Sequence, residues 1–132
     1  MTAAGVLDTS VFIAGESGRP LNVAHIPDQV ATTVITVAEL NAGVLAATNA
    51  EARAQRLATL DAVADLAALP VDVAAAQMWA RMRVHLAETG RRVRINDLWI
   101  AAVAASRDLP VVTQDGDFDP LDGVAGLSVL RV

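Results

Sequence analysis

The feature that most constrains this chain is a set of single acidic residues that interrupt otherwise apolar segments. The first of them, Asp8, directly follows the apolar run at residues 5–7 and precedes two hydroxyl residues, Thr9 and Ser10. In an open parallel sheet, ligands bind in the crevice outside the carboxyl ends of the strands. An acid at such a strand end is therefore expected to face a site, although turn-forming acids also occupy these positions.

Three further carboxylates stand in comparable settings. Glu39 lies within an apolar helical segment over residues 35–47, which is expected to be buried, and an unpaired buried carboxylate is strongly destabilising. Asp97 opens a helix that continues with apolar residues, and Asp115 follows the apolar strand 111–113. The alternative interpretations are a salt bridge from Glu39 to a distant arginine, helix capping by Asp97, and an ordinary turn at Asp115.

Brought together in one crevice, these four carboxylates would form a divalent-metal site. Mg²⁺ and Mn²⁺ prefer oxygen ligands and retain bound waters. Two such ions ~3.5–4 Å apart can activate a water and stabilise the leaving oxygen of a phosphodiester. Neighbouring polar side chains would orient the acids through hydrogen bonds. The candidates for this supporting role are Thr9, Ser10, Asn96 and Thr113.

The order of the expected elements indicates an α/β fold. Short strands are expected at 5–7, 32–34, 110–113 and 127–131, with a strand or connector at 69–71, and helices at 11–15, 35–47, 50–67, 73–88 and 97–107. Residues 21–31 are ambiguous, with a helix or irregular segment around 27–30. Asp72 and Asn96 are expected to cap the last two helices. Strands that alternate with helices predict a three-layer α/β/α arrangement around a parallel sheet of four to five strands.

Composition limits the classes of function. The 132 residues, 54% of them hydrophobic, predict one domain over residues 1–132 with a sizeable core. No apolar run reaches the ~20 residues of a membrane span, and the N-terminus lacks the features of a signal peptide. Cysteine is absent, which excludes a disulfide framework and a thiolate metal site. The expected location is the cytoplasm.

These residues resemble the PIN-domain nucleases, and more narrowly the VapC-type toxins of bacterial toxin–antitoxin pairs. Each matching motif is weak alone, but the ordered set spans essentially the whole chain. The motifs are Leu7-Asp8-Thr9-Ser10, Thr36-Val37-Ala38-Glu39-Leu40, Ile95-Asn96-Asp97-Leu98-Trp99-Ile100-Ala101-Ala102 and Thr113-Gln114-Asp115-Gly116-Asp117-Phe118. The one departure is a lead of four residues before Gly5, slightly longer than usual.

The resemblance implies hydrolysis of single-stranded or loop RNA with Mg²⁺ as cofactor and Mn²⁺ as a substitute. The residues that match its metal-binding acids are Asp8, Glu39, Asp97 and Asp115. Asp117 matches an additional acid whose direct metal contact varies among members. Thr9 and Thr113 match hydroxyl residues near the metal, and Asn96 matches the polar residue before the third acid. A homodimer is implied, silenced by a small antitoxin that enters the acidic crevice, often with an arginine.

The charged and aromatic residues allow two interpretations. The net charge of −5 argues against a nucleic-acid partner, although two divalent ions would nearly cancel it. All ten bases are arginine, whose planar guanidinium suits phosphate. The candidates for guiding RNA phosphates are Arg81, Arg83, Arg91, Arg92 and Arg94; the alternative is a solvated helix face and loop. Trp79 and Trp99 could stack on bases, but core packing is the favoured interpretation.

Other functions fit less well. A receiver-type regulatory domain and a haloacid-dehalogenase-type phosphatase both need a lysine, and this chain has none. A P-loop hydrolase needs a G-K-[ST] motif. Ser10 lacks the context of a serine nucleophile, and His25 and His85 are expected to be structural or solvent-facing. The open alternatives are a catalytically degenerate PIN-like metal- or RNA-binding regulatory module, and a PIN nuclease of RNA processing without an antitoxin.

Overall fold

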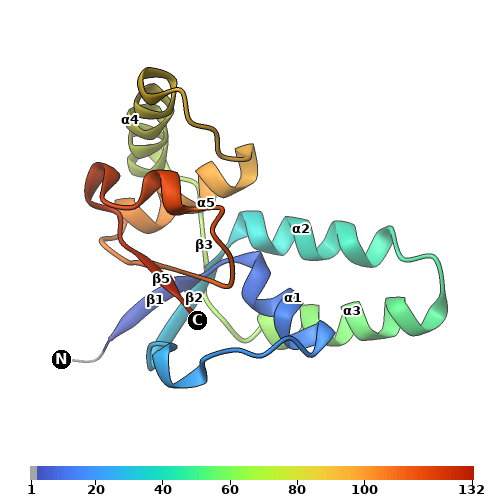
Figure 1. Cartoon of the computed structure of the whole chain (residues 1–132). Coiled ribbons are helices and arrows are strands. Elements are labelled where there is room, and N and C mark those ends of the chain that lie inside the picture. Colours follow the sequence, from blue (N-terminus) through green and yellow to red (C-terminus); the bar gives the residue numbers. More distant parts are fainter. Residues whose placement is uncertain (1–2) are drawn as a thin grey trace.

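The computed structural model describes residues 3–132, and its centre is a sheet of parallel strands (Figure 1). The strands of this part of the chain are β1 (Ala4–Leu7), β2 (Gln29–Thr33), β3 (Ala68–Leu69), β4 (Val111–Thr113) and β5 (Val129–Arg131). Their order across the sheet is β3-β2-β1-β4-β5, and all neighbouring pairs are parallel. The strand order reverses between β1 and β4, so the crevice at their carboxyl ends is where such a sheet binds ligands.

Helices connect the strands and cover the sheet. In the described part of the chain they are α1 (Thr9–Ser17), α2 (Val34–Leu45), α3 (Ala50–Val63), α4 (Val73–Thr89) and α5 (Ile95–Ser106), with 3-10 turns at Val23–His25, Asp119–Leu121 and Val124–Gly126. Asp72 caps α4 as predicted, because its Oδ1 accepts a hydrogen bond from the Ala75 N–H at 2.9 Å. No helix within residues 3–132 has the length and apolar character that crossing a membrane requires.

The two faces of the sheet carry separate apolar clusters. On one face, Val6 and Val111 pack with buried residues of α4 and α5. On the other face, Leu7 and Val112 pack with Val11 of α1. Consecutive strand residues point to opposite faces of a sheet. The dipeptides Val6-Leu7 and Val111-Val112 therefore each supply one residue to each cluster. The predicted three-layer α/β/α architecture is confirmed.

Several expected element boundaries differ from the structure, and three of them bear on the site. α1 begins at Thr9 directly after Asp8, and it extends to Ser17. Residues 29–33 form strand β2, since pairing with β1 and β3 on its two sides overrides the weak local signal. α5 begins at Ile95 with Arg94 at its N-cap, so Asn96 lies inside the first turn and is not the cap.

α2 is not the buried helix that its apolar composition predicts. Within this fully described helix the buried residues are Thr36 and Leu40, whereas Leu45 is 83% exposed. Its main packing partner is α3, and Figure 1 shows the two helices extending side by side away from the sheet. α3 covers one stripe of α2, and the sheet, α1 and α5 make only smaller contacts with it, so much of its apolar surface faces outward.

Candidate active site

The four predicted acids come from elements that meet at the carboxyl edge of the sheet. Asp8 follows β1, Asp115 lies two residues beyond β4, Glu39 lies in α2, and Asp97 lies in the first turn of α5. The carboxylates of Asp115 and Asp97 both raise the pKa of Asp8, and the Glu39 carboxylate raises the pKa of Asp97. The four acids therefore lie within electrostatic range of at least one other member of the set at this edge of the sheet.

Asp8 is almost completely enclosed, with 3% of its surface exposed. Ser10 Oγ donates a hydrogen bond to its Oδ1 at 2.7 Å, and Thr113 Oγ1 donates to its Oδ2 at 3.1 Å. Burial raises the pKa of Asp8 from its ordinary 3.8 to about 7, although these two hydrogen bonds oppose the rise. The ionised form of Asp8 is therefore destabilised unless a cation lies beside it.

The place of Asp8 in the chain leaves its carboxylate available to the crevice. Asp8 is the N-cap of α1, yet its side chain makes no cap hydrogen bond to the helix. Instead, Ser10 joins the ends of β1 and β4, because its Oγ also accepts a hydrogen bond from the Gln114 N–H at 3.0 Å. The hydroxyls of Ser10 and Thr113 thus fix both oxygens of Asp8, as the sequence pattern predicts for residues that orient an acid.

Glu39 is held by a hydroxyl residue rather than by a base. Thr9 Oγ1 donates a hydrogen bond to Glu39 Oε1 at 2.8 Å and lies 3.1 Å from Thr36 Oγ1. Glu39 is half-buried, and among the described residues it takes part in no ion pair. Sequence reasoning gave Thr36 no role. The available signal was its spacing of three residues before Glu39, which puts both on one face of α2.

Arg94 supplies positive charge at the crevice. Its Nε donates to Asp97 Oδ2 at 3.2 Å, and its Nη2 donates to Asp117 Oδ2 at 2.6 Å. Burial raises the pKa of Asp97 while Arg94 opposes that rise, and Asp97 and Asp117 in turn raise the pKa of Arg94. The guanidinium bridges acids from two separate segments, and its side chain is 75% exposed, so this bridge lies at the mouth of the crevice.

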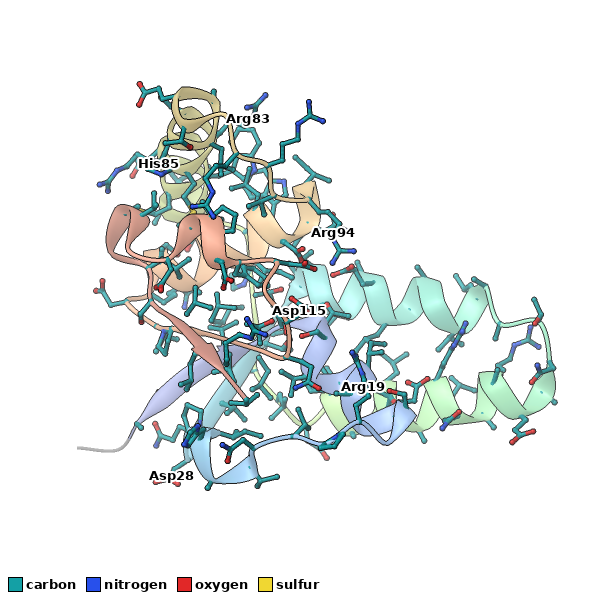
Figure 2. The ribbon with its side chains drawn as sticks, in the orientation of Figure 1. Arg19, Asp28, Arg83, His85, Arg94 and Asp115 are labelled. Carbon is teal, nitrogen blue, oxygen red and sulfur yellow. The ribbon has the colours of Figure 1, made fainter. Side chains whose placement is uncertain are left out.

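The loop after β4 completes the site. Asp115 Oδ1 accepts a hydrogen bond from the Asp117 N–H at 3.1 Å, which fixes the predicted polar turn. Asn96 is exposed and lines a cavity of about 370 Å³ together with Glu39, Arg94 and Asp97. In the view of Figure 2, Asp115 and Arg94 lie close to where α2 begins, with Arg94 above Asp115.

The donor atoms fit a hard divalent cation by their chemistry. Within residues 3–132, no three acidic or histidine side chains are close enough together to hold a metal ion as they stand. The available donors are nevertheless carboxylate and hydroxyl oxygens, which suit Mg²⁺ and Mn²⁺. The Arg94 guanidinium already acts as the counter-ion of Asp97 and Asp117. Asp8, in contrast, accepts hydrogen bonds only from neutral hydroxyls. A cation that binds Asp97 therefore has to compete with Arg94.

The five candidate arginines do not form one cluster. Arg83, Arg91 and Arg92 line one cavity, and Arg92 and Arg94 line a second cavity that also reaches the acids. Arg81 lies outside both cavities, and its Nη1 is 3.6 Å from the Met78 Sδ.

The aromatic and imidazole groups lie apart from this chemistry. The half-buried rings of Trp79 and Trp99 stack on each other with centroids 5.0 Å apart, which agrees with core packing. His25 is exposed beside Asn22, and half-buried His85 lies on α4, away from Asp115 in Figure 2.

Comparison with known proteins gives consistent matches over nearly the whole chain. The PIN domain family matches residues 5–124. Ribonuclease VapC5 of Mycobacterium tuberculosis (strain ATCC 25618 / H37Rv) is 72% identical over 130 residues, which cover 98% of this chain and 96% of that protein. Ribonuclease VapC4 of the same strain is 36% identical over 127 residues, covering 92% of this chain and 94% of that protein.

Solved structures give the same result at the level of the fold. The crystal structure of VapBC-5 from Mycobacterium tuberculosis, a member of the VapBC family of toxin–antitoxin systems, matches with a TM-score of 0.93 and 68% identity, over 98% of this chain and 99% of that chain. The DNA-bound VapBC from Salmonella typhimurium matches with a TM-score of 0.76 and 26% identity, over 98% and 97% of the two chains.

Proposed function

Because this chain belongs to the PIN-domain family, within its VapC group, we propose that it is a divalent-metal-dependent endoribonuclease and the toxin of a toxin–antitoxin pair. The observation that carries the proposal is the buried carboxylate of Asp8, which stands near Asp97 and Asp115 at the reversal point of the sheet. The naming of its relatives as VapC ribonucleases supports the reaction, and the VapBC complexes support the pairing.

We assign the metal to Asp8, Glu39, Asp97 and Asp115, with Asp117 as an additional acid, and we propose Mg²⁺ as the cofactor with Mn²⁺ as a substitute. When bound, such a cation supplies a water of lowered pKa and positive charge beside the scissile phosphate.

The protein's own hydrogen bonds would set the geometry. Ser10 and Thr113 hold the two oxygens of Asp8, and Thr9 holds Glu39. The positions of these carboxylates are therefore already fixed and need not change when the substrate binds. No side chain in this arrangement is placed as a nucleophile, and the proposed hydrolysis therefore proceeds without a covalent enzyme intermediate.

Metal removal gives the direct test. Purified, partner-free protein is expected to cut total cellular RNA into discrete fragments in the presence of Mg²⁺ or Mn²⁺. EDTA is expected to stop this cleavage, and excess Mg²⁺ to restore it, because the carboxylates alone supply no activated water. Gel analysis of the RNA provides the readout. Cleavage that persists in EDTA would contradict the metal site, and inactivity of the metal-loaded protein would favour the degenerate binding module.

Arg94 gives a second prediction, with metal binding as its readout. Replacing Arg94 by Gln removes a positive charge from Asp97 and Asp117, so Mn²⁺ is expected to bind roughly threefold to tenfold more tightly. Unit charges a few ångströms apart interact by about 1 kcal/mol even in water. Isothermal titration with Mn²⁺ measures the change. Arg107→Gln is the matched control, since Arg107 pairs with Asp72 instead, at 3.6 Å. Unchanged or weaker Mn²⁺ binding by Arg94→Gln would show that Arg94 does not compete with the metal.

The remaining assignments complete the proposal. We propose that residues 1–132 act as one PIN-like domain, that the protein forms a homodimer, and that a small cognate antitoxin protein silences it. We also propose that it acts on RNA in the cytoplasm. Size-exclusion chromatography with light scattering tests the dimer, and loss of RNA cleavage on adding the co-expressed antitoxin tests the pairing.

A further inference from the structure

A hollow lined by arginine and apolar side chains lies between the end of α4 and the start of α5. α4 ends at Thr89, and the φ of 66° at the following Gly90 turns the chain into the loop at residues 91–94, which runs back to α5. The hollow has a volume of about 560 Å³. Its lining includes Arg83, Arg91 and Arg92 together with the apolar residues Leu86, Val93 and Leu98.

The floor of this hollow is rigid because it belongs to the core. Leu86 and Leu98 are both buried members of the cluster that packs α4 and α5 against the sheet, and Val93 is half-buried against the same cluster. A pocket of several hundred Å³ with an apolar floor and a few convergent charged groups is typical of a small-ligand subsite.

The charge at its rim is uncompensated. Among the described residues, the ion pairs of arginine with carboxylate involve Arg94, Arg107 and Arg131, and none involves Arg83, Arg91 or Arg92. The chain carries a net charge of −5, so acids to pair with these three arginines are abundant. Three neighbouring arginines without acidic partners repel one another, and this arrangement points to an anionic ligand from outside the chain.

The hollow leads directly to the acids. Arg92 and Val93 line both this hollow and a second cavity of about 480 Å³, which is bordered by Arg94, Asp97 and Asp117. In the view of Figure 2, Arg94 lies between Arg83 on α4 and Asp115 at the end of the sheet. A chain of phosphates can therefore pass from the arginine rim to the carboxylates without leaving a lined surface.

We propose that this hollow binds a nucleotide of single-stranded RNA next to the phosphodiester that is cut. The inference rests on the proposed ribonuclease function. The guanidinium groups of Arg83, Arg91 and Arg92 hold the backbone phosphate, and the base and ribose lie over the apolar floor, where Val93 and the exposed Ile95 offer contact surface. Phosphate contacts position the strand, whereas the apolar floor offers no side-chain hydrogen bond to a base edge. The subsite therefore sets the register of the RNA with little base preference.

The inference separates Arg83 from Arg81, which lie two residues apart on the same helix. Both side chains are exposed, but Arg83 lines the hollow whereas Arg81 lies outside it. Arg83→Gln and Arg81→Gln change the net charge of the protein equally, so they form a matched pair. Any difference between them reports on location rather than on overall charge.

The test measures binding of a fluorescein-labelled single-stranded RNA of mixed sequence by anisotropy. The full-length protein carries Asp8→Asn as a background that prevents cleavage. Arg83→Gln and Arg92→Gln are each expected to weaken binding roughly threefold to tenfold at about 0.1 M salt. Each is also expected to reduce the slope of log K against log salt by about 0.7, the value for one lost contact with a single strand. Arg81→Gln is expected to stay within twofold, with an unchanged slope, and melting curves verify that all variants are folded.

The outcomes are distinct. Equal effects of Arg81→Gln and Arg83→Gln, or no effect of either Arg83→Gln or Arg92→Gln, would overturn the subsite, and its charge would then serve a protein partner. Cleavage by the unsubstituted protein with Mg²⁺ is measured in parallel. A selective loss of binding without any cleavage would overturn the proposed nuclease and leave an RNA-binding site in place, whereas cleavage with unselective binding would overturn only this inference.

Discussion

Replacing Asp8 by Asn is expected to abolish RNA cleavage while leaving the protein folded. Asn keeps the shape of the side chain but removes the charge that would hold a cation at the reversal point of the sheet. A loss of about 4 kcal/mol of transition-state stabilisation corresponds to about 10³-fold in rate. Asp97→Asn is expected to have a comparable effect, because Asp97 is the other largely buried acid of the crevice. Single-turnover cleavage of a labelled RNA with Mg²⁺ measures both.

The matched control for these substitutions is Asp28→Asn. This substitution removes the same charge from the protein. Asp28 is exposed just before β2, at the amino edge of the sheet, and lies far from Asp115 in Figure 2. Its cleavage rate is expected to stay within twofold of the unsubstituted protein. Far-UV circular dichroism and melting verify the fold of all three variants. Full cleavage by Asp8→Asn and Asp97→Asn would show that the metal site has been assigned to the wrong residues.

The layered fold was readable from the sequence because its signals are local. Composition alone predicts two buried elements, the β-branched and apolar run at 111–113 and the apolar helix after Asp97. The dipeptide Val6-Leu7 is buried on both faces of the sheet, which is what a central parallel strand requires. Once the strands are placed, the positions of Asp8 and Asp115 at neighbouring carboxyl ends follow from topology.

The features that sequence reasoning missed depend on contacts between distant segments. The composition of α2 suggests burial, but exposure depends on how many elements pack against it, and α3 is its main neighbour. The ion pair of Arg94 with Asp97 could have been predicted, because the two residues are three positions apart at the start of a helix. The contact of Arg94 with Asp117 joins residues 23 positions apart and could not. In the same way, the approach of Thr9 to Glu39 requires α1 and α2 to be placed first.

Raising the pH is expected to lower the free energy of unfolding of the metal-free protein, because buried Asp8 must ionise in the folded state. This carboxyl has its pKa raised by burial from 3.8 to about 7, so between these values the folded state holds a proton that the unfolded state has lost. The stability that Asp8 contributes is therefore fully present below pH 3.8 and is lost as the pH rises through about 7. At 1.36 kcal/mol per pKa unit, the loss amounts to about 4 kcal/mol.

Asp8→Asn isolates this contribution from those of the other acids, because it removes one titrating group and leaves the rest. Urea unfolding in EDTA is expected to show the variant gaining stability relative to the unsubstituted protein as the pH rises from about 4 to 8. A difference that does not change with pH would mean that Asp8 ionises normally in the folded state. At pH 8, Mg²⁺ is expected to raise the melting temperature of the unsubstituted protein but not of the variant, because only an ionised Asp8 gains from a cation. The same burial that destabilises the charged carboxylate thus makes it a strong cation ligand, and this links the stability of the protein to its proposed activity.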